Sequence, residues 1–228
     1  MKRPNPQTIM VALLSFNAGF VDATGFFGLQ GLFVAHVTGN FVTLGAALVH
    51  GSHGVVGKVL ALPEFVAVVA LAHIAGRALQ ARKRPAQRVL LAAKVVLLLA
   101  FFALAVTYGP FPDPNTPAAL LTGFSGIAAM AVQNAVQRVH FGTLPPTTMM
   151  TGSTVQATLD AVDLLGGGGD PAQAAALRSR FGRIAITLAS FGLGCALAAL
   201  LYARFGFWCL GVAVVVGAAA AAIRSSDG

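Results

Sequence analysis

Six stretches of about 20 mostly apolar residues constrain this chain more than any motif does. They cover about residues 8–29, 62–80, 89–108, 117–137, 182–203 and 205–223. An α-helix rises about 1.5 Å per residue, so about 20 apolar residues cross a hydrocarbon core of about 30 Å. We expect each stretch to be a membrane-spanning helix in an all-α, polytopic helix bundle.

The polar residues are too few and too scattered for a separate soluble domain. Charged residues make up 10% of the chain, whereas a soluble domain carries roughly 25%. We therefore expect one membrane domain over residues 1–228, surrounded by the lipid bilayer. The net charge of +8 does not indicate nucleic-acid binding, because the basic residues lie at the ends of apolar stretches, as membrane topology requires.

Two further segments, about 33–49 and 147–165, are shorter and more polar than the six stretches. If only the six stretches span and the amino terminus is cytoplasmic, thirteen of the 15 Lys and Arg residues fall on the cytoplasmic side. Models with eight spanning segments lose this excess of basic residues on one side, and such an excess normally sets the orientation of a membrane protein. We therefore expect both termini in the cytoplasm and two short re-entrant or broken segments. Lys94, near the inner end of its helix, is expected to extend its amine to the interface.

The chain contains an internal repeat. Asp22 lies in "GFVDA" and Asn134 lies 112 residues later in "AVQNA"; Thr38 lies in "VTGNFV" and Thr151 lies 113 residues later in "MTGSTV". Each pair of blocks precedes two more spans. Three spans per copy is an odd number, so the copies, about 8–108 and 117–223, must run in opposite orientations. Inverted-topology repeats are a recurring plan of membrane transporters.

These blocks also resemble a known family. "FNAGFVDATGFFGL", "FVAHVTGNFVTLG", "AVQNAVQ" and "PPTTMMTGSTVQ" are similar to the hallmark blocks of the YoaK-like family of uncharacterised bacterial membrane proteins. The resemblance extends over nearly the whole chain. It implies a bacterial inner-membrane protein with about six helices, and it supplies no substrate.

Asp22 is the residue that most needs a function. It lies somewhat past the middle of the first stretch, where an acid costs about 2.5 to 3.5 kcal/mol and usually faces a bundle interior or a water-filled cavity. It either binds a solute or ion, or holds the broken backbone of the Thr-Gly segment that follows. Gly25, Gly28 and Gly31 fit a helix that unwinds just beyond the carboxylate, close packing of helices through small residues, or both.

Neutral hydrogen-bonding residues gather in both copies and suit a small polar solute or a cation. The Pro145–Pro146 pair predicts a short helix from near residue 148, whose free amides would point at a polar site. The candidate substrate- or ion-binding residues are Asp22, His36, Thr38, Gly39, Asn40, Gln133, Asn134, Thr151, Gly152 and Ser153.

No motif predicts a cofactor, a metal or an enzyme. "GGGGD" at residues 166–170 lacks the Gly-Lys-Ser/Thr of a phosphate loop, and Cys195 and Cys209 have no partners at metal-ligand spacing. We expect a small secondary transporter whose solute binds around Asp22. A passive channel, an intramembrane enzyme using Asp22 and His36, and a structural role stay open as alternatives. Faces of small residues also fit a homo-oligomer.

Overall fold

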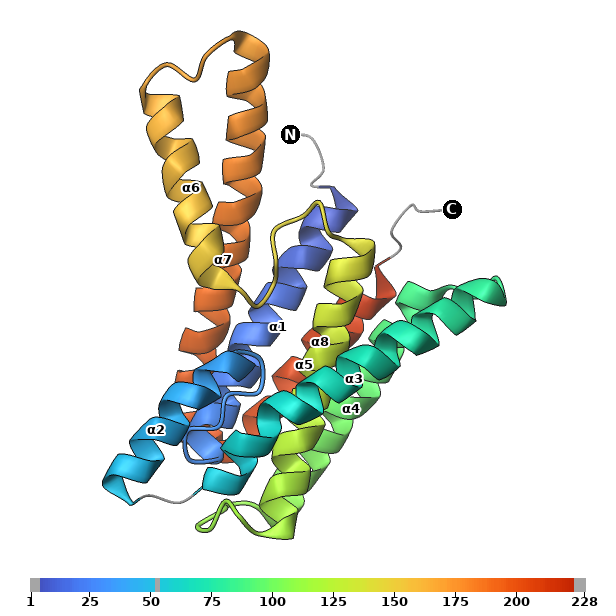
Figure 1. The fold of residues 1–228 in the computed structure, drawn as a ribbon, viewed down its shortest axis with the longest axis vertical. Coiled ribbons are helices and arrows are strands. Elements are labelled where there is room, and N and C mark those ends of the chain that lie inside the picture. The colour runs from blue at the N-terminus through green and yellow to red at the C-terminus, as the bar shows by residue number, and fades with distance from the viewer. Residues whose placement is uncertain (1–4, 52–53, 224–228) are drawn as a thin grey trace.

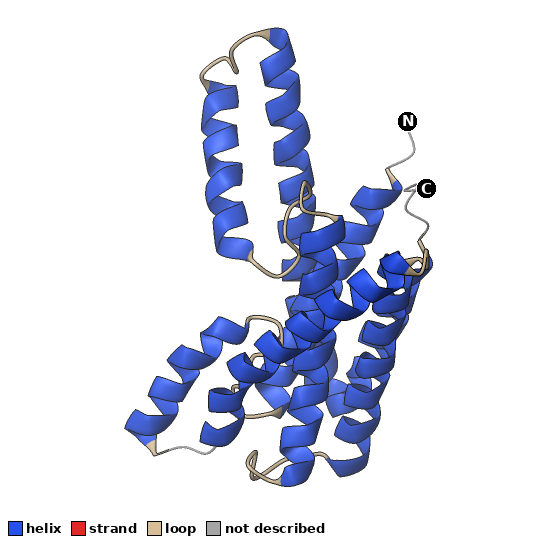
Figure 2. Ribbon diagram, turned by 45° about the vertical axis from the view of Figure 1, so that its right-hand side comes forward, coloured by secondary structure: helices blue, strands red, loops and turns tan. Residues whose placement is uncertain are grey.

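A computed structural model describes residues 5–51 and 54–223. In these ranges the chain forms eight α-helices and two 3-10 helices, with no strand (Figures 1 and 2). Their bounds are α1 (Pro6–Gly28), η1 (Val37–Gly39), α2 (Asn40–His50), α3 (Val55–Ala81), α4 (Ala86–Tyr108), α5 (Pro117–His140), α6 (Met150–Leu165), α7 (Pro171–Phe205), η2 (Gly206–Cys209) and α8 (Leu210–Ala222). The predicted all-α class is confirmed. Three basic residues used for orientation, Lys2, Arg3 and Arg224, lie outside the described ranges.

Five helical stretches in the described ranges are long and apolar enough to cross a membrane, so the chain is a multi-pass membrane protein by length and hydropathy. Four of them are α1, α3, α4 and α5. The fifth, Pro171–Ala222, is 52 residues long and contains both of the last two predicted spans. The two parts are joined at Gly206, where φ is +55°, and Figure 1 shows α8 running back along the bundle from this turn.

Two helices begin earlier than the apolar stretches indicate. α3 begins at Val55 rather than near residue 62, with Pro63 inside it, and α7 begins at Pro171 rather than near residue 182. Pro63 removes one backbone hydrogen bond from α3 without ending the helix. α7 begins early because Asp170 caps it by accepting a hydrogen bond from the Gln173 amide at 2.8 Å, and the helix continues through charged residues.

The two centrally placed helices are α1 and α5. In their apolar windows 67% and 72% of residues are buried, against 22% in α3 and in Pro171–Ala222. α1 packs mainly on α7 and α8, α5 packs mainly on α4 and α3, and α4 contacts α8 to join the two groups. The outer helices therefore keep apolar faces available to lipid, whereas the helices that carry Asp22 and Asn134 are enclosed.

Lys94 does not reach an interface as expected. Its side chain is fully buried in α4, and its Nζ has no hydrogen-bond partner among the described residues. The side chain is enclosed because α8 packs on α4 at this point, with Gly217 beside the lysine amine.

α1 and α7 approach each other so closely that their backbones touch. A Cβ placed on Gly19 would overlap the carbonyl oxygen of Phe191, and one placed on Gly194 would overlap the carbonyl oxygen of Phe16. Small residues that let helix backbones meet are a common packing device in membranes. The pair fixes the separation of α1 and α7 next to Asp22.

The short helices α2 and α6 lie outside this bundle. They begin near its middle and run in opposite directions, α2 downward and α6 upward in Figure 1. α2 packs on α3, and α6 packs on α7. Both expose large apolar side chains, such as Val49 at 79% and Leu165 at 88%. Neither helix is among the five long stretches, in agreement with the predicted difference between segments 33–49 and 147–165 and the six spans.

We predict that Gly194→Ala lowers the melting temperature of the purified protein, because the added methyl group must push α1 away from α7. Overpacking costs about 1 to 3 kcal/mol, which corresponds to a few degrees for a chain of this length. Gly192→Ala is the matched control, since a Cβ there meets nothing within 4 Å. An equal loss in both variants, measured by thermal unfolding in detergent, would contradict the backbone contact.

Candidate functional site

The Asp22 carboxylate holds the backbone break that follows α1. Its Oδ1 accepts hydrogen bonds from three successive amides, those of Val34 (2.9 Å), Ala35 (2.7 Å) and His36 (3.1 Å). Asp22 is only 5% exposed. Fixed amide donors offset much of the cost of burying a carboxylate. One of the two expected roles of Asp22, holding the broken backbone, is therefore visible in the structure.

The local sequence explains how residues 34–36 reach Asp22. α1 ends at Gly28, six residues beyond the carboxylate, as expected if the glycine series unwinds the helix. The chain then turns back and is tied by Asn40, whose side chain accepts from the Phe33 amide at 2.9 Å and donates to the Phe33 carbonyl at 2.8 Å. The helix end, the loop and the start of α2 thus form one hydrogen-bonded unit.

The second break, before α6, is also held by side chains of the long helix that precedes it, here two side-chain amides of α5 that bind threonine hydroxyls. Asn134 Oδ1 accepts from the Thr148 hydroxyl at 2.6 Å, and Gln133 Nε2 donates to the Thr147 hydroxyl at 2.9 Å. α6 itself begins at Met150, with no side-chain cap. The helix therefore starts two residues later than the prolines predict, because the two threonine hydroxyls bind α5 instead of capping α6.

The two breaks meet at a cleft of about 340 Å³. α1, the segment before η1, the start of α6 and α7 all contribute to its wall. Its lining residues are Asp22, Ala23, Phe26, Phe27, Phe33, His36, Thr148, Met150, Thr151, Phe191 and Cys195. Asp22 Oδ2 accepts no hydrogen bond from the described residues, so one oxygen of the carboxylate is not engaged by protein donors there.

The structure distributes the ten predicted site residues over several places. Asp22, His36 and Thr151 line the cleft, and Asn134 contacts it through Thr148. Asn40 and Gln133 hold the two breaks and line neither cavity described in this subsection. Thr38 is exposed, Gly39 packs on the rings of Phe33 and His36, and Gly152 and Ser153 line the second cavity.

Several cleft residues carry no polar signal in the sequence. Phe26 lies four residues after Asp22, one helical turn away on the same face, so it could have been found from spacing. Phe191 and Cys195 come from α7, more than 160 positions along the chain, and no local pattern marks them. Among the described residues, no three His, Cys, Asp or Glu side chains gather as a metal site needs.

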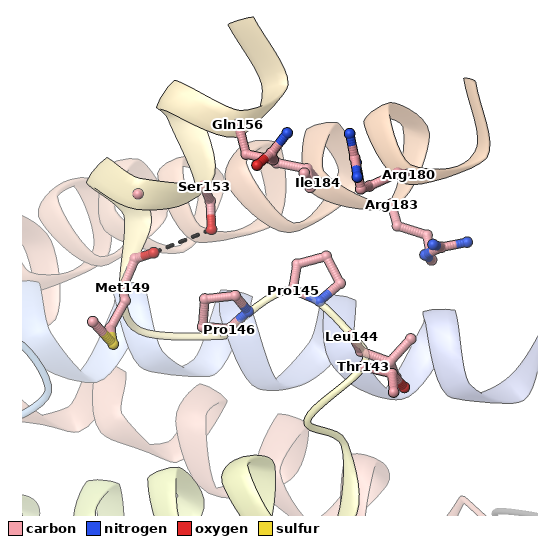
Figure 3. Close-up of a pocket in the computed structure, with 11 residues that line it drawn as sticks. Thr143, Leu144, Pro145, Pro146, Met149, Ser153, Gln156, Arg180, Arg183 and Ile184 are labelled. Atoms are coloured by element: carbon pink, nitrogen blue, oxygen red, sulfur yellow. Dashed lines mark hydrogen bonds between the residues drawn. The ribbon is translucent and has the colours of Figure 1, made fainter. Parts of the chain in front are cut away.

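A second cavity of about 300 Å³ lies between the loop before α6, the start of α6 and α7 (Figure 3). Pro145 and Pro146 form one side, and Arg180 and Arg183 of α7 also line it. Arg180 is paired with the Asp160 carboxylate of α6, its Nε lying 2.8 Å from Oδ2. This ion pair holds α6 against α7 above the cleft.

Residues 10–223 match the model of a family described as "Protein of unknown function (DUF1275)". The chain belongs to the DUF1275 family. The match supports the uncharacterised family implied by the sequence blocks, but it does not carry the YoaK designation. No curated protein and no solved structure matches this DUF1275 chain.

We predict that Asp22→Ala destabilises the protein much more than Asp22→Asn. Alanine leaves three amides without their acceptor, at about 1 to 3 kcal/mol for each buried group, whereas asparagine keeps an oxygen in the position of Oδ1. Thermal unfolding should show a loss for Asp22→Asn less than half that for Asp22→Ala. Equal losses would mean that charge, and not hydrogen bonding, secures the break.

We predict that the ion pair between Asp160 and Arg180 makes stability depend on pH. The hydrogen bond from Arg180, helped by one from Gln156, lowers the pKa of the Asp160 carboxyl below its usual 3.8. A lowered pKa stabilises the folded state above the unfolded pKa, and the stability is lost as pH falls through the folded value. The melting temperature of wild type should exceed that of Asp160→Asn at pH 7, and this difference should shrink below pH 4.

The control for this experiment is Asp163→Asn, one turn along α6 and exposed. It should melt close to wild type at both pH values. A wild-type advantage over Asp160→Asn that persists unchanged to pH 3 would exclude ionised Asp160 as its source.

Proposed function

We propose that the protein is a small secondary transporter whose solute binds in the cleft at Asp22. The observation that carries the proposal is a buried carboxylate with one oxygen fixed by three amides and the other free of protein donors in the described chain, within a cleft built from both halves. Ionisable residues inside membrane helices default to functional sites. The substrate is a small polar or ionic solute.

An inverted repeat underlies this proposal, with copies of about 8–108 and 117–223. Each half has the same element order: a long enclosed helix, a break, a short helix that leaves the bundle, and then two more helical segments. α1 and α5 end 112 positions apart, at Gly28 and His140. The packing is also reciprocal, since α1 of the first half contacts α7 and α8, and α5 of the second half contacts α3 and α4.

The two breaks share one hydrogen bond at the same spacing along the chain. The side chain of Asp22 binds the amide of His36, and that of Asn134 binds the hydroxyl of Thr148, in each case 14 positions further on. In transporters with inverted repeats, discontinuous helices of this kind meet at the solute site near the membrane midplane. We propose that 33–49 and 147–165 are re-entrant or broken segments of this type.

The distribution of basic residues supports an orientation with both termini cytoplasmic, and the bacterial inner membrane is proposed from the family resemblance. The start of α1 and the end of α8 lie on the same side of the bundle (Figure 1). The amino-terminal part of α7, which carries three arginines, lies on the same side. α7 has 35 residues, so at about 1.5 Å per residue its length exceeds the thickness of a hydrocarbon core. This arrangement agrees with the positive-inside rule.

Transport is favoured over catalysis by the way the reactive groups are used. Asp22 Oδ1 already accepts three amide hydrogen bonds, and the Cys195 thiol donates to the Gly19 carbonyl at 3.3 Å. Among the described residues no hydrogen bond joins either group to a basic side chain, as activation of a nucleophile requires, and His36 reaches Asp22 through its backbone amide. We therefore propose a binding site and no enzyme.

The test is solute-dependent flux in proteoliposomes. Currents on solid-supported membranes are recorded under an imposed proton or sodium gradient, against a panel of amino acids, carboxylates, inorganic cations and organic ammonium ions. At least one solute should give a saturable current that increases with the gradient. Asp22→Asn should reduce this current about tenfold or more, while Asp163→Asn leaves it unchanged.

Two results would overturn the proposal. One is a panel in which no solute gives a current above that of empty liposomes. The other is flux that rises linearly with concentration and ignores ion gradients, which is the behaviour of the passive channel. An unchanged rate in Asp22→Asn would remove the carboxylate from the mechanism.

A further inference from the structure

We infer that the cleft at Asp22 selects an organic cation, an ammonium ion that carries apolar groups. The inference rests on the proposed function and specifies the class of its solute. It follows from the composition of the cleft wall, which combines one carboxylate and four phenyl rings with the polar side chains of His36, Thr148, Thr151 and Cys195.

The charge of the cleft lining determines the sign of the charge that a ligand should carry. Asp22 is the acidic residue in the cleft lining, which contains no lysine or arginine; its one histidine, His36, binds Asp22 Oδ1 through its backbone amide. The oxygen Oδ1 is occupied by amides, so Oδ2 is available to an incoming cation. A cationic solute would restore charge balance in a place where an unpaired charge is costly, whereas an anion would add to the charge of the carboxylate.

The phenyl rings decide between an organic and an inorganic cation. Phe26, Phe27 and Phe33 line the cleft together with Asp22, and Phe191 of α7 also lines it. The ring centroids of Phe26 and Phe33 are 4.8 Å apart. Aromatic side chains attract ammonium groups through their π-systems, and quaternary ammonium ions are recognised by clusters of such rings.

A bare metal ion is a poor fit to the same wall. Sodium, potassium and magnesium need several oxygen ligands in place of water, but the side-chain oxygens in the lining belong to Asp22, Thr148 and Thr151 alone. The cleft of about 340 Å³ is at the small end of the range for small-molecule sites. It accommodates a compact organic ion better than a dehydrated metal ion.

Binding to the full-length protein in nanodiscs of phosphatidylglycerol tests the inference, because these lipids carry no ammonium group. Isothermal titration uses choline, tetraethylammonium and benzyltrimethylammonium as probes, with 3,3-dimethylbutan-1-ol as the uncharged counterpart of choline. At least one ammonium probe should bind, and the neutral alcohol should bind at least about tenfold more weakly than choline or not at all.

Variants then locate the binding. Asp22→Asn should weaken ammonium binding about tenfold, and Phe26→Leu should weaken it several-fold. Phe41→Leu is the control, because Phe41 lies on α2, is 59% exposed and does not line the cleft. Absence of binding by all three ammonium probes, or an affinity that Asp22→Asn and Phe26→Leu leave unchanged, would overturn the inference.

Repeating the titration in phosphatidylcholine nanodiscs separates two sources of the same chemistry. A weaker apparent affinity there assigns the cleft to the lipid headgroup, and an unchanged one assigns it to a free solute. The outcomes also separate this inference from the transport proposal. Ammonium binding without flux overturns transport and keeps the site, whereas flux of another solute without ammonium binding overturns the inference alone.

Discussion

The hydrogen bonds from three amides to Asp22 Oδ1 are the interaction on which the rest of this site depends. Without them the backbone amides of Val34, Ala35 and His36 would have no acceptor. Irregular backbone inside a bilayer is tolerated only if protein or water covers it. With them, the chain can leave the helix at Gly28, turn back and begin a second, short helix. The same bonds leave one oxygen of the carboxylate uncommitted. One acidic side chain thereby supports the break and charges the cleft beside it.

The positions of most helices follow from hydropathy, since the predicted stretches 89–108 and 117–137 agree closely with α4 and α5. The starts of α3 and α7 do not follow from it. Lys58 and the arginines of α7 interrupt the apolar pattern, so hydropathy places the helix starts too late. The backbone hydrogen bonds of a helix form through charged residues as well, and both helices begin before their apolar parts. The turn at Gly206 does follow from the sequence, because the predicted stretches 182–203 and 205–223 are divided at Arg204, close to the end of α7 at Phe205.

The candidate site was predictable only where its chemistry is polar and repeated. Asp22 and Thr151 could be named from the two matching blocks and His36 from its place two residues before Thr38, and all three line one cleft. Phe191 and Cys195 could not, because a phenyl ring or a thiol in an apolar helix has no signature until the partner helix is placed. Sequence reasoning also left open whether Asp22 binds solute or holds backbone. The geometry shows that Oδ1 holds the backbone, and it leaves Oδ2 without a protein donor among the described residues.

The contact of Gly19 with Phe191 and of Gly194 with Phe16 determines which wall of the cleft can move. α1 carries Asp22 and α7 carries Phe191 and Cys195, and their backbones already touch, so these two walls form one rigid block. The other walls are two loop segments. The segment before η1 is held by the Asp22 carboxylate, and the segment around Thr148 is held to α5 by side-chain hydrogen bonds. Any change in the shape of the cleft therefore requires these segments to shift, since the contact of α1 with α7 fixes the rest.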